Sequence, residues 1–128
     1  MKDTILVVDD HPVNLKLLRV LLSAEGYDVR EATDALGVLA GLRLFTPKLI
    51  LMDIQLPGLD GHALTRLLKA NPRTAGLVIV AVTAYAMKGD EQRMLAAGCD
   101  GYLAKPIDTR LLPGLVEGYL RDFAEARL

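Results

Sequence analysis

Five short apolar runs recur along the chain, and a segment with helical spacing of its apolar residues follows each of them. The runs cover residues 5–8, 27–30, 49–52, 77–82 and 102–104. Runs one, three and four are apolar at every position, which is typical of strands buried on both faces of a parallel sheet. The second run alternates apolar and polar residues and predicts an edge strand. Five such strand–helix units in 128 residues predict one α/β domain with right-handed crossovers and a doubly wound sheet.

The first helix is expected to open with Pro12 in its first turn and to end near Gly26. Its predicted face at helical spacing consists of Asn14, Leu17, Leu18, Leu21 and Leu22. Asp34 and Asp60 stand where N-caps of the second and third helices are expected.

The fourth helix is predicted over residues 88–97, ending at Gly98, and the fifth from about Asp108. Gly37 and Gly41 share a face of the second helix, as Gly114 and Gly118 do in the fifth. Each glycine costs about 1 kcal/mol relative to alanine in a helix interior. We interpret both pairs as sites of close packing.

Composition limits the partners and the compartment. Fifteen basic and 16 acidic residues give a formal net charge of −1, so DNA and anionic membranes are not expected to bind through a bulk field. Cys99 is the single cysteine, which excludes an internal disulfide and predicts a buried small residue. The N-terminus resembles neither a signal peptide nor a membrane span. These features predict a cytoplasmic protein.

Polar residues follow the predicted strands at one edge of the sheet. Asp9 and Asp10 follow the first strand, Asp53 the third, Thr83 the fourth and Lys105 the fifth. Ligands of open parallel sheets bind at the carboxyl ends of the strands, where the strand order reverses. We therefore expect these five side chains to meet in one site.

Three carboxylates in one site repel one another, by about 4 kcal/mol for two charges 4 Å apart at an effective dielectric constant of 20. An all-oxygen site with room for water and phosphate suits Mg²⁺. Asp53, at the centre of the sheet, is the expected nucleophile toward a phosphoryl group. Mg²⁺ and Lys105 would neutralise the equatorial oxygens, and Thr83 would donate to a third oxygen.

Four motifs together resemble the receiver domains of two-component response regulators. They are VVDD at 7–10, LMDIQLPGLDG at 51–61, AVTA at 81–84 and YLAKP at 102–106. The resemblance spans essentially the whole chain and implies a flavodoxin-like (βα)5 fold. That fold has five parallel strands in the order 2-1-3-4-5 and helices on both faces. Within the family, residues 84–90 and 98–102 are most similar to single-domain regulators and hybrid-kinase receivers.

The resemblance also implies the role of each site residue. Asp53 would be the phosphoacceptor and a metal ligand, Asp10 a direct ligand of Mg²⁺ and Asp9 a ligand largely through water. The backbone carbonyl of Gln55 would complete the protein ligands. Lys105 would be the salt-bridging lysine.

Further implied roles concern the read-out and the partners. Thr83 and Tyr102 match the family's switch pair, and Pro106 its usually cis proline. The expected donor is a sensor histidine kinase or a histidine phosphotransfer protein. Its docking surface is expected to consist of Asn14, Tyr85, Pro106 and Ile107.

The expected organisation is a single receiver domain over 1–128 with no effector domain, so output requires a downstream protein target. The state expected is a monomer or a weak phosphorylation-dependent dimer. The ring of Tyr85 is also expected to obstruct water attack on the acyl phosphate.

The residues argue against three other functions. A flavodoxin would need a Ser/Thr/Gly-rich phosphate loop after the first strand, where this chain has Asp9 and Asp10. An aspartyl phosphatase would ordinarily need a carboxylate two residues after the nucleophile, where Gln55 stands. An interaction module that is not phosphorylated would lack a site residue. Histidines 11 and 62 are both expected to be exposed and outside the catalytic set.

Overall fold

The computed structural model describes residues 3–56, 58, 60–83 and 90–126. Five strands alternate with five helices in this part of the chain, as predicted. The elements are β1 (Thr4–Val8), α1 (Pro12–Ala24), β2 (Asp28–Ala32), α2 (Ala35–Leu42), β3 (Leu49–Asp53), α3 (Gly61–Ala70), β4 (Val78–Thr83), α4 (Asp90–Ala97), β5 (Gly101–Ala104) and α5 (Leu112–Ala126).

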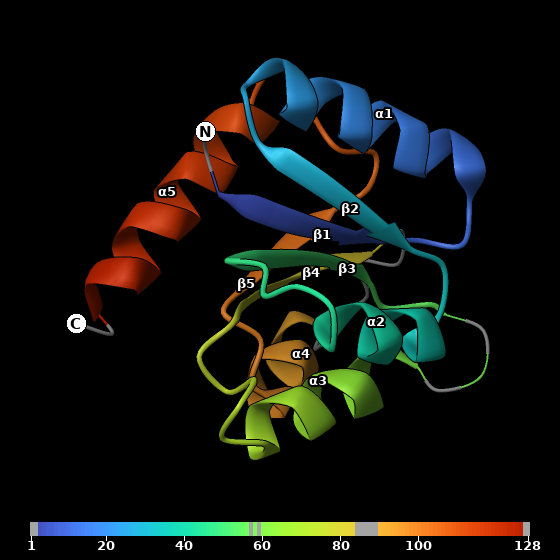
Figure 1. Ribbon diagram of the computed structural model, residues 1–128, viewed down its shortest axis with the longest axis vertical. Coiled ribbons are helices and arrows are strands. Elements are labelled where there is room, and N and C mark those ends of the chain that lie inside the picture. The colour runs from blue at the N-terminus through green and yellow to red at the C-terminus, as the bar shows by residue number, and fades with distance from the viewer. Residues whose placement is uncertain (1–2, 57, 59, 84–89, 127–128) are drawn as a thin grey trace.

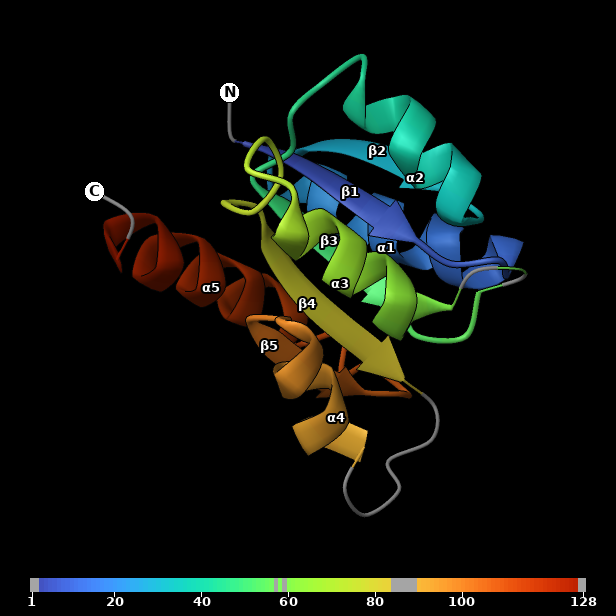
Figure 2. The same cartoon turned by 90° about the horizontal axis from the view of Figure 1, so that it is seen from below.

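All strand pairs are parallel, and the order across the sheet is β2-β1-β3-β4-β5. Figures 1 and 2 show α1 and α5 on one face of the sheet and α2, α3 and α4 on the other. The predicted flavodoxin-like order and the edge position of β2 are therefore confirmed. The order reverses between β1 and β3, so the carboxyl ends of these two strands are adjacent.

The core consists of one apolar cluster on each face of the sheet. Residues of β3 are buried without exception, and those of β4 likewise, because helices cover both faces of these inner strands. The side chains of β3 alternate between the clusters, with Leu49 and Leu51 facing α1 and α5, and Ile50 and Met52 facing the other three helices.

The predicted face of α1 was wrong in part. The buried residues of this helix are Leu15, Leu18 and Leu22, whereas Leu17 is 44% exposed. The leucines of this segment form two overlapping stripes, and the sequence does not say which stripe packs on the sheet. Leu17 instead lies with the exposed residues Val13 and Val20 on an outward face.

The caps of α2 and α3 are confirmed. Asp34 accepts a hydrogen bond from the backbone N–H of Gly37 at 2.7 Å, and Asp60 accepts one from that of Ala63 at 2.9 Å. The fourth helix ends before Gly98, which has φ +109°, as its prediction required; residues 88 and 89 lie outside the described part of the chain.

The fifth helix begins at Leu112 and not near Asp108. The Asp108 carboxylate accepts a hydrogen bond from the backbone N–H of Arg110 at 2.9 Å. Residues 109–111 form a turn instead of the first turn of the helix. Pro113 then falls in the first helical turn, where its missing N–H removes no intrahelical hydrogen bond.

Close packing explains only one of the two glycine pairs. A Cβ on Gly37 would lie 3.1 Å from Asp34 Oδ1, and one on Gly41 would lie 3.2 Å from the Phe45 ring. A Cβ on Gly114 would have no neighbour within 4 Å, so the interpretation was wrong for α5.

Two further findings concern Cys99 and the apolarity of the helices. Cys99 is buried as predicted, and burial is the main reason why the pKa of its thiol rises to about 11. Among the described residues, no helix has the length and apolarity that crossing a bilayer requires.

Candidate functional site

Parallel pairing brings the predicted site residues to one edge of the sheet. The register pairs Val8 with Met52, and these residues immediately precede Asp9 and Asp53. Thr83 is the last residue of β4 and pairs with Ala104, which precedes Lys105. Each of these side chains therefore lies at the carboxyl end of its strand or directly after it.

Lys105 joins two buried carboxylates. Its Nζ lies 2.9 Å from Asp9 Oδ2 and 3.1 Å from Asp53 Oδ2. The side chain of Lys105 is 17% exposed, and those of Asp9 and Asp53 are 3% and 5% exposed. Hydrogen bonds and a compensating charge are what buried carboxylates require in order to stay ionised.

Both carboxylate oxygens of Asp53 accept a hydrogen bond. The backbone N–H of Gln55 donates to Oδ1 at 3.0 Å, and Lys105 donates to Oδ2. Gly61, which sequence reasoning did not single out, lets α3 start close to this loop, because its backbone N–H donates to the Ile54 carbonyl at 2.8 Å. A Cβ on Gly61 would lie 2.7 Å from Ile54 Cα.

Three carboxylates and one imidazole gather beside this lysine. One ligand atom from each of Asp9, Asp10, His11 and Asp53 lies within 4.8 Å of the others. Asp10 is exposed, unlike the other two carboxylates. The cluster fits a hard divalent cation, which prefers carboxylate and carbonyl oxygens and keeps several waters.

Burial and hydrogen bonding act differently on the two buried acids. Burial raises the pKa of Asp53, and the hydrogen bonds from the Gln55 backbone and from Lys105 offset it only in part. Burial also acts upward on the pKa of Asp9. Hydrogen bonds from the His11 backbone and Lys105 outweigh it there, so the pKa of Asp9 lies below its ordinary value.

The pKa of Lys105 is raised. Burial alone would lower it, but the hydrogen bonds and charges of Asp9 and Asp53 outweigh that effect. A lysine with a raised pKa stays cationic at neutral pH, which the two carboxylates need.

Histidine 11 belongs to the site more closely than predicted. Its side chain is 67% exposed, as expected, yet Nδ1 lies 3.2 Å from Asp9 Oδ1 and 3.0 Å from Asp10 Oδ1. Its backbone N–H donates to Asp9 at 2.9 Å. The prediction for His62 was wrong: this residue is half-buried, and its buried Nε2 has no hydrogen-bond partner in the part of the chain described here.

The predicted switch residues lie on neighbouring strands. Thr83 is buried at the end of β4. Tyr102 is half-buried in β5, pairs with Ala81 and packs against the cluster below α2, α3 and α4. Tyr85 lies outside the described residues.

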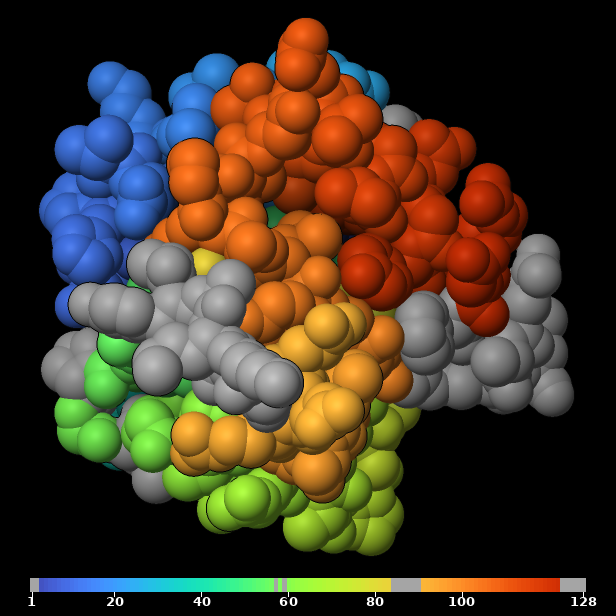
Figure 3. Space-filling view, turned by 180° about the vertical axis from the view of Figure 1, so that it is seen from behind, coloured from blue at the N-terminus to red at the C-terminus, as the bar shows by residue number. Residues whose placement is uncertain are grey.

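Three of the predicted partner-binding residues line a pocket together with Asp9 and Lys105. Its volume is about 440 Å³, and its walls are Asp9, Asn14, Leu17, Leu18, Lys105, Pro106 and Ile107. The Lys105–Pro106 peptide bond is cis, and Asn14 Nδ2 donates to Asp9 Oδ2 at 3.3 Å. Figure 3 shows the segment after β5, in orange, next to α1, in blue.

The comparisons with known proteins agree with this geometry. Residues 5–117 match the family described as Response regulator receiver domain. The chain is 39% identical over 122 residues to the polar-differentiation response regulator DivK of Brucella anthropi, covering 95% of this chain and 99% of that protein.

Two solved structures resemble the fold closely. One is the receiver domain of the sensor histidine kinase PA1611 from Pseudomonas aeruginosa PAO1, with a magnesium ion coordinated in the active site cleft. Its TM-score is 0.86 at 33% identity, covering 95% of this chain and 100% of that chain. The other is the signal receiver domain of a signal transduction histidine kinase from Syntrophus aciditrophicus, with a TM-score of 0.86 at 29% identity, covering 94% of this chain and 91% of that chain.

A family match over most of the chain, a full-length relative and the acidic site with its lysine lead to one assignment. They also exclude the flavodoxin and phosphatase alternatives. The chain belongs to the response regulator receiver domains, which are signalling switches and not enzymes.

Proposed function

We propose that this chain accepts a phosphoryl group on Asp53 from a phosphohistidine and signals by phosphorylation-dependent protein binding. The observation that carries the proposal is the hydrogen bonding of Lys105 Nζ to both buried carboxylates, Asp9 and Asp53. Burying charged groups costs desolvation energy that their mutual attraction often does not repay, so stability alone does not account for this arrangement. A site that must receive a multiply charged anion does need such a cation.

The chain's own residues perform the transfer. An oxygen of the Asp53 carboxylate forms the new bond to phosphorus as the phosphorus–nitrogen bond of the donor breaks. The leaving imidazole takes a proton from solvent. Lys105 and the Thr83 hydroxyl stabilise the charge on the phosphoryl oxygens.

Asp9, Asp10 and Asp53, with the backbone carbonyl of Gln55, would hold Mg²⁺. This assignment is supported by the gathered oxygen donors, and the solved relative from Pseudomonas aeruginosa has magnesium in its active site cleft. When bound, the ion supplies positive charge that neutralises the carboxylates and the incoming phosphoryl group.

Acetyl phosphate tests the function without a partner protein. Incubation with Mg²⁺ should add one phosphoryl group, and incubation with EDTA should add none. Intact-mass spectrometry after mild treatment measures both. A mass gain that does not depend on the metal would contradict the proposed role of the acidic cluster.

Removing the Thr83 hydroxyl should separate phosphorylation from its read-out. Thr83→Ala is expected to accept the phosphoryl group but to lose the response of Tyr102, because a charge-assisted hydrogen bond of about 1.5–3 kcal/mol is gone. That energy shifts a two-state equilibrium by one to two orders of magnitude. The response is measured by fluorine NMR of protein labelled with 3-fluorotyrosine. Thr109→Ala, at an exposed position, is the control and should keep the response. An unchanged response in Thr83→Ala would mean that the signal bypasses this residue.

The donor should dock on the pocket beside the site. Ile107 is half-buried and packs against the core cluster under α1 and α5, so a charge there would also disturb folding. Leu17 lines the same pocket and is 44% exposed, which makes it the better test.

Leu17→Glu is expected to slow phosphoryl transfer from a histidine phosphotransfer protein at least tenfold, because a charge would be buried in an apolar contact. Phosphorylation by acetyl phosphate should not change. Leu36→Glu, on the opposite face of the sheet and 78% exposed, is the matched control. Equal slowing with both donors would place the damage in the site itself.

A further inference from the structure

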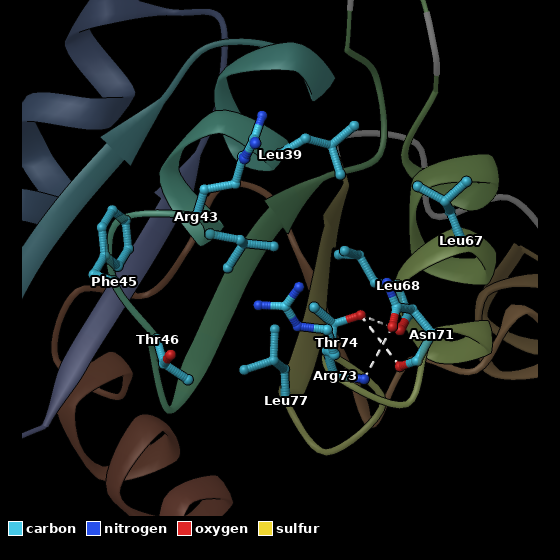
Figure 4. A pocket seen from close by; sticks show the side chains of 11 residues that line it. Leu39, Arg43, Phe45, Thr46, Leu67, Leu68, Asn71, Arg73, Thr74 and Leu77 are labelled. Carbon is cyan, nitrogen blue, oxygen red and sulfur yellow. Dashed lines mark hydrogen bonds between the residues drawn. The ribbon is translucent and has the colours of Figure 1, made fainter.

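A second pocket lies at the amino ends of β3 and β4, whereas Asp53 lies at the carboxyl end of β3. It is bounded by the ends of α2 and α3 and by the loops that lead into β3 and β4, and its volume is about 530 Å³ (Figure 4). Pockets for small organic ligands have volumes of about 300–1,000 Å³. Its walls include Leu77, which precedes β4, whereas Asp53 and Thr83 end their strands. A ligand here would therefore not occupy the phosphorylation site.

The lower walls of this pocket are apolar. Leu68 and Leu77 are buried members of the core, and the partly buried Leu39 and Leu42 pack against the same core cluster. Leu67 stands at the α3 side and is 50% exposed. An apolar ligand body would remove these side chains from water, which is favourable in proportion to the area covered.

The polar part of the pocket is cationic. Arg43 and Arg73 line it from opposite elements, and none of the residues that line it is acidic. Neither guanidinium has an ion pair or a hydrogen bond with any residue that the structure describes. The C-termini of α2 and α3 contribute about half a negative charge each, so the two arginines leave the pocket with a net positive charge.

The wall that carries Arg73 is pre-formed. Asn71 Oδ1 accepts the backbone N–H of Arg73 at 3.0 Å, and the Thr74 hydroxyl donates to two carbonyls at the end of α3, at 2.6 and 3.4 Å (Figure 4). Lys69 Nζ donates to two carbonyls of the same loop, at 2.7 and 3.3 Å. A ligand would not have to order this loop, so its binding energy would not be spent on ordering.

From these features we propose that the pocket between α2 and α3 binds a small organic anion with an apolar body. A carboxylate or phosphate head would pair with Arg73, whose planar guanidinium group suits both anions. Arg43, whose side chain is directed away from Arg73 (Figure 4), would add positive charge beside the pocket. The apolar body would lie against the leucines. Both parts contribute, because an inorganic anion would leave the leucines uncovered and a neutral apolar molecule would gain nothing from the positive charge of the arginines.

A fluorescent anion with an aromatic body, 1-anilinonaphthalene-8-sulfonate, serves as the probe. The parent is expected to bind one molecule saturably. Arg43→Gln with Arg73→Gln should weaken that binding at least tenfold. The control pair, Arg66→Gln with Arg93→Gln, makes the same change of charge at exposed positions outside the pocket and should weaken binding less than twofold. Equal weakening in both pairs, or no saturable binding by the folded parent, would overturn the proposal.

Displacement of the probe tests the two parts of the ligand separately. Dodecyl phosphate, kept below its micelle concentration, should displace the probe, and inorganic phosphate at the same concentration should not. If both displace it equally, the apolar body plays no role and the proposal is wrong. Phosphorylation by acetyl phosphate should be normal in Arg43→Gln with Arg73→Gln, so this proposal and the proposed function fail independently.

Discussion

Asp53→Asn is expected to abolish phosphorylation by acetyl phosphate and Mg²⁺ while the fold stays intact. The amide has nearly the shape of the carboxylate but no nucleophilic charged oxygen, so no acyl phosphate can form. Burial raises the pKa of Asp53, which means that ionisation of this group at neutral pH opposes folding. The thermal midpoint of the variant, measured in EDTA, should therefore equal or exceed that of the parent.

Asp60→Asn is the matched control for this experiment. Asp60 is exposed and caps α3 from the same connecting segment, and asparagine is an equally good N-cap. The control should keep both phosphorylation and stability. A phosphoryl group retained by Asp53→Asn would move the acceptor to another residue and remove the basis of the proposed function.

Lys105→Ala is expected to destabilise the domain by about 3–5 kcal/mol in EDTA, the range for breaking a buried ion pair. The loss is large because Asp9 and Asp53 would then share a buried site with no cation between them. A domain of this kind is stable by about 5–15 kcal/mol in total. Urea unfolding measures the change, and Lys16→Ala, at an exposed position of α1, should have almost no effect.

Two additions should each return part of the stability that Lys105→Ala loses. Saturating Mg²⁺ binds the folded state and stabilises it by mass action. Asp53→Asn in the same chain removes one of the two facing charges. If neither addition restores stability, the loss comes from packing of the lysine stem and not from the carboxylates. Some phosphorylation should survive in the folded fraction, because Asp53 is unchanged.

The sequence predicted the meeting of Asp9, Asp53 and Lys105 better than it predicted individual helices. Asp53 and Lys105 could be placed because a parallel sheet brings the carboxyl ends of its strands to one edge, whatever the details of packing. The packed face of α1 could not be placed, since leucines at 15, 17, 18, 21 and 22 satisfy two overlapping stripes. The start of α5 was displaced by the hydrogen bond from Arg110 to Asp108, a local turn that competes with the helix.

The pocket between α2 and α3 had no signal in the sequence. Arg43 and Arg73 are far apart in the chain, and each stands in a segment that connects a helix to a strand. Only the crossovers on one face of the sheet bring the two segments together. Polar residues at the amino ends of strands carry no general expectation of function, unlike those at the carboxyl ends.

The burial of every residue of β3, at the middle of the sheet between β1 and β4, sets where hydrogen exchange can occur. Amides in such a strand exchange with deuterium mainly through opening of the whole domain, and those of edge strands through smaller, local openings. Asp53, the proposed phosphoacceptor, thus ends one of the two strands of the described chain that are buried throughout and should exchange slowly. A phosphoryl group on Asp53 would therefore have a rigid strand behind it, and we expect its charge to act first on the segments that follow the strands.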